Sequence, residues 1–269
     1  MPNLLTVENL AKSYTARRAR DSGLAVRALD GVSLSLSDGE TLAVVGASGS
    51  GKSTLALCLA CLEKPTSGSV SFEGRDLLMI GEAELRKIRP KIQLVFQDPA
   101  SSLNPRFSAF ELLSEPWRVG GSLPRSEWRT QACELMRITG LPSDLLSRRP
   151  MEFSGGQRQR LAIARGLAAW PKILILDEAL SSLDPALQAQ IANLLVDLRE
   201  SRELAMVFST HDPAMAAHLA DKIAVMERGK IVEQGTPREI LRQPQHEATL
   251  KLLAATPRKI LRSRPPVVP

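Results

Sequence analysis

The chain has 269 residues, 43% hydrophobic and 24% charged, which is enough for one substantial core with or without a smaller satellite subdomain. Arg165 and Pro171 interrupt its most apolar stretch, 161–176, so no window approaches the roughly 18 to 20 apolar residues of a membrane-spanning helix. The formal net charge of +6 could attract nucleic acid or anionic lipid. However, no aromatic residues lie among the scattered basic ones to stack on bases, so a solvated face or a lipid-adjacent tail is favoured and no nucleic-acid partner is expected.

The first ten residues have neither a basic start nor a long apolar run, so we expect no secretory signal and place the chain in the cytoplasm. Cys58 and Cys61 form a C-x-x-C pair. They lie among Leu55, Leu59 and Leu62 at helical spacing. Buried, apolar thiols explain this pattern better than redox chemistry.

The first predicted elements are strands. Residues 4–10 and 32–36 alternate apolar and polar side chains, which predicts half-buried strands of an N-terminal β-sheet. Residues 41–45 predict a fully buried strand that ends at Gly46, and 53–62 predict a helix. The order is therefore strand, glycine-rich loop, helix.

The middle of the chain, about 98–160, is polar-rich and helical in pattern and is interpreted as an inserted helical subdomain. Breaks are expected at Pro116, Gly120–Gly121, Pro124 and 140–142. Buried strands are expected again at 173–176, 206–209 and 223–226. Helical stretches separate these strands, which predicts a parallel sheet covered by helices and hence an α/β fold. The predicted domain spans 1–241, and a C-terminal extension, 242–269, ends in a basic, partly disordered tail.

The strongest motif matches the pattern G-x-x-x-x-G-K-[ST] between the predicted strand and helix. Its residues are Gly46, Ala47, Ser48, Gly49, Ser50, Gly51, Lys52 and Ser53, followed by Thr54. Glycines let backbone N–H groups surround phosphates, Lys52 supplies positive charge, and the Ser53 hydroxyl can bind Mg²⁺. The alternative is a plain glycine-rich turn, but the strand and helix on either side favour a nucleotide site.

Two acids, Asp177 and Glu178, directly follow the predicted strand 173–176. Ligands bind at this end of parallel strands. Asp177 can hold Mg²⁺, and Glu178 can orient or deprotonate a water molecule. An acidic pair at a helix N-terminus is the alternative for the two acids alone, but the phosphate loop earlier in the chain favours the catalytic interpretation.

The segment 153–160, Phe-Ser-Gly-Gly-Gln-Arg-Gln-Arg, resembles the signature motif of the ATP-binding cassette (ABC) family, with Phe153 where Leu is commoner. With the phosphate loop and the two acids in this order, the resemblance covers about residues 4–257. It implies a RecA-like P-loop NTPase core with an N-terminal antiparallel β subdomain and an inserted α-helical signature subdomain. It also implies an ATPase that uses ATP and Mg²⁺, with the signature of one subunit facing the nucleotide of another. Locally, the segment is also a serine-capped helix.

The same resemblance assigns further residues. Tyr14 resembles the aromatic that stacks on adenine, although a packed strand-end aromatic is possible there. Gln97 resembles the glutamine that senses Mg²⁺ and water, and a solvated loop residue is the alternative. The resemblance places Ser154, Gly155, Gly156 and Gln157 at the nucleotide of the opposite subunit, Asp184 in the D-loop that communicates across the dimer, and His211 at the γ-phosphate. Asp184 could also simply cap a helix.

Two strings, 97–106 and 244–257, resemble the dipeptide, oligopeptide and nickel importer branch of the family. The expected partners are a second ABC ATPase subunit, either sibling or self, two transmembrane permeases and, indirectly, an extracytoplasmic substrate-binding protein. The chain is then peripheral at the cytoplasmic face of the membrane. Ala179 replaces the proline usual after the glutamate, and no cysteine follows Cys133 to hold an iron–sulfur cluster. The alternatives are an exporter subunit, a soluble ABC ATPase without a transport role, or a subunit that binds ATP without hydrolysing it.

Overall fold

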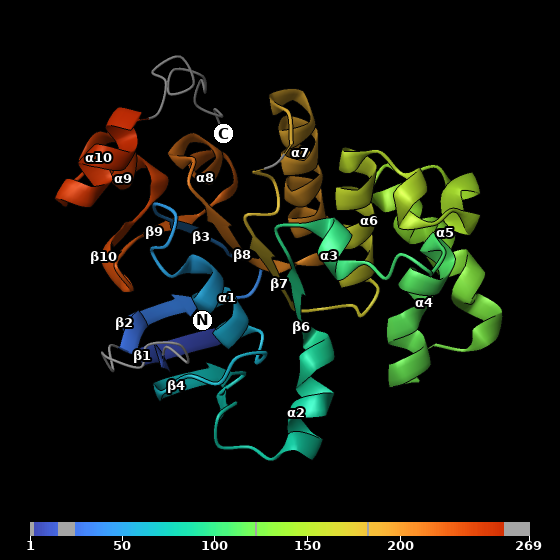
Figure 1. Cartoon of the computed structure of the whole chain (residues 1–269), viewed down its shortest axis with the longest axis horizontal. Helices are drawn as coiled ribbons and strands as arrows, with labels where there is room; N and C mark the ends of the chain where they lie inside the picture. Colours follow the sequence, from blue (N-terminus) through green and yellow to red (C-terminus); the bar gives the residue numbers. More distant parts are fainter. Residues whose placement is uncertain (1–2, 16–24, 122, 182, 256–269) are drawn as a thin grey trace.

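The computed structural model describes residues 3–15, 25–121, 123–181 and 183–255. Two β-sheets occupy its centre (Figure 1). The four-stranded sheet is antiparallel, in the order β2 (Ala25–Leu36), β1 (Leu5–Thr15), β4 (Ser67–Phe72) and β5 (Arg75–Asp76). The six-stranded sheet has the order β10 (Lys230–Gly235), β9 (Lys222–Glu227), β3 (Thr41–Val45), β8 (Ala205–Thr210), β7 (Ile173–Asp177) and β6 (Ile92–Val95). Its strands run parallel except β10, which pairs antiparallel with β9 at the edge.

Most helices connect strands of the second sheet. In chain order they are α1 (Lys52–Leu59), α2 (Glu82–Ile88), α3 (Pro99–Ser102), α4 (Ala109–Gly120), α5 (Trp128–Ile138), α6 (Gly155–Leu167), α7 (Pro185–Arg202), α8 (Pro213–Leu219), α9 (Pro237–Arg242) and α10 (Glu247–Ala255). Helices α3 to α6 all lie between β6 and β7 in sequence and form the right-hand part of Figure 1. The two sheets and this insertion confirm the predicted fold class.

The central strands β3, β7 and β8 of the six-stranded sheet are buried on both faces, and alternate residues of each strand point to opposite faces. In β3, Leu42 and Val44 belong to the apolar cluster that also contains α1 and the antiparallel sheet. Ala43 and Val45 belong to the other cluster, which includes α4 to α8. Full burial on both sides explains why β3, β7 and β8 are continuous apolar runs, and it holds their carboxyl ends in fixed positions.

Helix α1 is shorter than expected. It ends at Leu59 rather than at 62, because Cys61 adopts a left-handed backbone conformation, with φ +55°, and turns the chain out of the helix. As a result, Leu62 is exposed rather than packed with Leu55 and Cys58. Strand β6 was not predicted, because a four-residue strand next to a short 3₁₀ segment gives little periodicity.

The expected break at Pro116 is wrong, because this residue lies inside α4. The next residue, Trp117, is buried, and its Nε1–H donates to the Ala168 carbonyl at the end of α6, 2.7 Å away. This packing outweighs the backbone hydrogen bond that a proline removes from a helix. The breaks at Gly121 and Gly140 are confirmed, and both residues have positive φ after their helices.

Helix α10 belongs to the predicted C-terminal extension and packs on the core. The Glu233 carboxylate on β10 accepts hydrogen bonds from the backbone N–H groups of Gln245 and His246 and from the Thr249 hydroxyl. The remainder of the extension, 256–269, with its predicted basic tail, lies outside the described residues. Among the helices of the described part, none is both long and apolar enough to cross a membrane.

The two cysteines of the C-x-x-C pair should be unreactive. Loss of solvent raises the pKa of the Cys58 and Cys61 thiols to about 11. In a Cys133→Ser variant at pH 8, a thiol reagent should therefore modify the folded protein about 100-fold more slowly than the urea-unfolded protein, because the thiolate fraction falls by about that factor. Equal rates, or a Cys58–Cys61 disulfide formed in the folded protein, would contradict the packing interpretation.

Candidate functional site

The phosphate-loop motif lies between β3 and α1, and its glycines pass close to other backbone segments. Gly46 N–H donates to the carbonyl of Thr210 at the end of β8, 3.3 Å away. A Cβ atom on Gly46 would lie 2.3 Å from the Met226 carbonyl oxygen, and one on Gly51, whose φ is +110°, would lie 2.4 Å from that of Ala28. Any larger side chain at either position would require the backbone to move, so the glycines fix the path of the loop.

The start of α1 fits an anion. No side chain caps this helix, and its first turn contains no acidic residue. The Ser50 hydroxyl is buried without a hydrogen-bond partner among the described residues, and Ser53 is exposed at the first turn. The uncapped N–H groups and the positive end of the helix dipole therefore suit phosphate, as the motif predicted.

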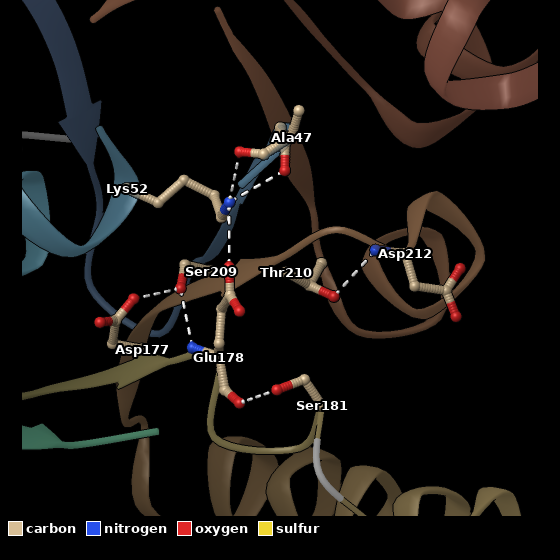
Figure 2. Close-up of polar contacts among 9 residues, drawn as sticks. Ala47, Lys52, Asp177, Glu178, Ser181, Ser209, Thr210 and Asp212 are labelled. Carbon is tan, nitrogen blue, oxygen red and sulfur yellow. Dashed lines mark hydrogen bonds and ion pairs between the residues drawn. The ribbon is translucent and has the colours of Figure 1, made fainter. Parts of the chain in front are cut away.

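Lys52 is the most constrained side chain of the loop. It is 4% exposed, and its Nζ donates to the carbonyl oxygens of Gly46 (2.9 Å) and Ala47 (3.0 Å). The same Nζ lies 3.0 Å from Oε1 of Glu178, as Figure 2 shows. A buried ammonium group requires such partners, because it has lost its water. Lys52 therefore joins the phosphate loop to the acid that follows β7.

The two predicted acids point to different partners. Asp177 ends β7 and is 7% exposed, and the Ser209 hydroxyl on β8 donates to its Oδ1 at 2.6 Å. Glu178 faces Lys52 instead, and its own backbone N–H donates to Ser209 Oγ at 2.8 Å. Successive residues at the end of the strand thus direct their carboxylates to different partners (Figure 2).

The site fits Mg²⁺ better than a metal held by the protein alone. Within the described residues, no group of three or more His, Cys, Asp or Glu side chains could hold a metal ion. Asp177, the Ser53 hydroxyl and the Gln97 amide can supply hard oxygen ligands. Mg²⁺ commonly binds through one or two carboxylates and completes its shell with substrate phosphates and water.

His211 and Gln97 lie at the same edge of the sheet as the acids. His211 directly follows β8, is exposed, and lines a cavity of ≈ 60 Å³ together with Ser181 and Ser209. Gln97 follows β6 and is exposed. Because β6 and β8 both flank β7, the sheet order places the two residues on either side of the acids.

The predicted signature residues lie apart from this edge. The Ser154 hydroxyl accepts from Gln157 N–H (3.3 Å), and Gln157 Oε1 accepts from Ser154 N–H (2.9 Å), so the pair caps α6. Ser154 and Gly155 are exposed, while a Cβ on Gly156 would lie 2.0 Å from a methyl of Leu187 on α7. In Figure 1, α6 is separated from α1, so the signature and the phosphate loop of one chain do not face each other.

Two other predicted residues also lie outside the loop. Asp184 caps α7 by accepting from Leu187 N–H at 3.0 Å. Tyr14 is near the end of β1 in the antiparallel sheet and is 39% exposed. The Lys12 Nζ lies 4.9 Å from the centre of the Tyr14 ring, so one face of the ring has a cationic neighbour.

The sequence analysis missed the hydroxyl groups around the acids. Ser209 falls within the buried strand predicted at 206–209, and Ser181 lies three residues before Asp184 of the predicted D-loop. Ser181 donates to the Glu178 carbonyl oxygen through Oγ at 2.8 Å and through N–H at 3.0 Å. The available signal was a serine at the carboxyl end of an otherwise apolar strand, two residues before the predicted site residue His211.

The sequence also matches one family over the segment that contains the loop and both acids. The ABC transporter family matches residues 29–181. This chain belongs to the ABC transporter family. The cassette is 47% identical over 255 residues to the oligopeptide transport ATP-binding protein OppD of Mycobacterium tuberculosis. That alignment covers 95% of this chain but 41% of the relative, so the cassette spans less than half the length of that protein.

A shorter relative and two solved structures are also similar to this chain. The dipeptide transport ATP-binding protein DppF of Escherichia coli K12 is 44% identical over 95% of this chain and 77% of its own length. A dimeric structure of the ATP-binding cassette MJ0796, in a post-hydrolysis state bound to ADP and Pi, has a TM-score of 0.78 at 32% identity, covering 87% of this chain and 99% of that one. The structure of cbiO1 from Clostridium perfringens, part of the ABC transporter complex cbiONQ, has a TM-score of 0.77 at 31% sequence identity. The match covers 90% of this chain and 92% of that one.

Replacing Gly46 tests the path of the loop. Gly46→Ala should lower the free energy of unfolding by about 1–3 kcal/mol and weaken nucleotide binding, because its Cβ meets the Met226 carbonyl. Gly81→Ala is the control: its Cβ meets nothing within 4 Å, so its cost should stay below about 1 kcal/mol, with nucleotide affinity unchanged. Urea titrations and ATP-binding measurements compare the two, and equal behaviour would show that the close approach does not constrain the loop.

Proposed function

We propose that this ABC cassette binds and hydrolyses ATP as a subunit of an importer for peptides, nickel or a related small solute. The observation that carries the proposal is the buried Lys52 ammonium, which lies between the phosphate loop and Glu178. The names of the relatives concern oligopeptides and dipeptides, which supports peptides as the first substrate class to test.

ATP binding would exchange the partners of Lys52. The β- and γ-phosphates would bind the N–H groups in the first turn of α1 and the Lys52 ammonium, which now bonds to two carbonyls and to Glu178. Ser53, Asp177 and Gln97 would hold Mg²⁺, which neutralises phosphate charge when bound. Tyr14 would stack on the adenine.

Hydrolysis would then use the groups at the edge of the parallel strands. Once Lys52 moves to phosphate, Glu178 is released to orient or deprotonate the attacking water. His211 and Gln97 would position that water and the γ-phosphate from the two neighbouring strands. Lys52 would stabilise the charge that develops on the transferred phosphoryl group.

A second cassette, a sibling or another copy, would complete the site. Ser154 and Gly155 are exposed at the start of α6, and with Gly156 they would offer a hydroxyl and backbone N–H groups to a γ-phosphate, with Gln157 holding the cap. In its own chain this segment lies away from α1. The reported dimeric structure of a similar cassette bound to ADP and Pi supports a pair of cassettes, which we propose is head to tail. Asp184, at the cap of α7 beside the signature helix, would take part in contacts across that pair.

Two permeases would connect the pair of cassettes to the membrane. The chain would then be a peripheral subunit at the cytoplasmic face, with a substrate-binding protein acting on the opposite side and no nucleic-acid partner. Movement of the inserted helices α3 to α6 relative to the strands would transmit closure of the dimer to the permeases.

The role of Glu178 is tested with a single-atom change. In the assembled complex, Glu178→Gln should lower ATP turnover by at least about 100-fold, because it removes the general base. ATP affinity should be equal to or tighter than in the wild type, since the phosphates no longer compete with a carboxylate for Lys52. The matched control is Glu8→Gln on an exposed part of β1, with wild-type turnover. Undiminished hydrolysis in Glu178→Gln would remove the glutamate from this role.

The partner assignment is tested by purification from membranes. We expect the tagged chain to retain two permease subunits and a second cassette through size-exclusion chromatography. Addition of a substrate-binding protein loaded with its solute should then stimulate ATP hydrolysis by this complex. Retention of ribosomes or DNA in place of permeases would contradict a transport role. Stimulation by a solute from the cytoplasmic side would indicate export.

A further inference from the structure

A single hydroxyl group connects the two acids of the site. Ser209 is near the end of β8 and is 3% exposed, and the parallel register places it directly beside Asp177 on β7. Its Oγ donates to Asp177 Oδ1 at 2.6 Å and accepts from the backbone N–H of Glu178 at 2.8 Å (Figure 2). Both donor–acceptor distances are within the range of strong hydrogen bonds, and the first bond is charge-assisted because its acceptor is a carboxylate.

The backbone at Glu178 has an unfavourable conformation. Its φ is +44°, in the left-handed region that a residue with a Cβ rarely adopts and that costs roughly 1–3 kcal/mol. Hydrogen bonds hold this residue on both sides. Ser209 accepts from its N–H, and Ser181 donates to its carbonyl through both Oγ and N–H. The conformation that directs the Glu178 side chain toward Lys52 is therefore held by Ser181 within the turn and by Ser209 from the neighbouring strand.

We infer that Ser209 is a positioning residue, whose hydroxyl orients the Asp177 carboxylate and fixes the Glu178 backbone at the same time. The inference rests on the proposed ATPase function and adds a residue to it. Only a group that both donates and accepts can make these two bonds, because a carboxylate requires a donor and a backbone N–H requires an acceptor. Serine and threonine meet this requirement, whereas alanine and valine do not.

Ser209 also connects the two acids to the segment of chain that carries His211. It is two residues before His211 on the same chain segment, and Gly46 of the phosphate loop donates to the intervening Thr210 carbonyl. A shift of the end of β8 would therefore move His211, the loop and both acids together. The hydroxyl sets the spacing between β8 and the acids at the point where the proposed reaction takes place.

The test compares Ser209→Thr with Ser209→Val, which have the same shape and differ in the hydroxyl, together with Ser209→Ala. In the assembled complex, the variants Ser209→Ala and Ser209→Val should have a kcat lowered by about 10-fold or more. The Mg²⁺ concentration that they need for half-maximal ATP binding should rise by a similar factor. ATP binding without Mg²⁺ should change less than about twofold, because the loop is intact. The variant Ser209→Thr, which keeps the hydroxyl, should have both quantities within about threefold of the wild type.

A second readout uses the nucleotide-free full chain. The Glu178 amide should exchange its hydrogen slowly in the wild type and in Ser209→Thr, and at least about 10-fold faster in Ser209→Ala and Ser209→Val. Ser114→Ala is the control: it removes another buried serine hydroxyl, which donates to the Glu111 carbonyl on α4, and it should leave Mg²⁺ dependence and Glu178 exchange unchanged.

The outcomes separate this inference from the proposed function. Turnover and Mg²⁺ dependence in Ser209→Val equal to the wild type would overturn the inference, as would equal losses in Val and Thr, since packing alone would then explain them. If Val and Ala do not fold, rapid exchange of the Glu178 amide in the wild type would still overturn it. A wild-type complex that binds permeases but hydrolyses no ATP would instead overturn the proposed function.

Discussion

The buried ammonium group of Lys52 is the interaction on which the site depends. It bonds to two carbonyls of its own loop and to Glu178, and so links the first crossover of the parallel sheet to a strand more than 120 residues later in the chain. Breaking a buried ion pair by removing one partner costs about 3–5 kcal/mol, because the remaining charge is left without compensation. A triphosphate can displace Glu178 only by offering a better partner. If, as proposed, Lys52 binds the triphosphate, then ligand binding and release of Glu178 would be one event.

The parallel sheet explains why segments distant in sequence meet. β3, β8 and β7 are neighbours, and the carboxyl ends of parallel strands lie at one edge. The loop after β3, His211 after β8 and the acids after β7 therefore converge without any contribution from flexible connections. Burial of both faces of these strands prevents the edge from shifting. The signature segment begins α6 in the inserted part of the chain, and α6 lies apart from α1.

The sequence was most informative where local pattern and chemistry coincide. The strand 41–45, the loop from Gly46 and the acids at 177 and 178 could all be predicted, because each motif requires particular residue types at fixed spacing. The predicted end of α1 and the predicted break at Pro116 were wrong, because the left-handed turn at Cys61 and the burial of Trp117 depend on tertiary contacts. The Lys52–Glu178 pair and the Ser209 hydrogen bonds depend on strand order and register, which no local pattern contains. The roles of the signature residues and of Tyr14 remain predictions from resemblance.

In the proposed mechanism, this loop acts on triphosphate only when the serine–glycine segment of a second cassette faces it. ATP turnover per cassette should therefore be measured over a range of protein concentrations, with the oligomeric state of the same samples followed by light scattering. Turnover should rise with the fraction of paired cassettes and approach zero when the chain is monomeric. Constant, full turnover by a strictly monomeric chain would contradict it.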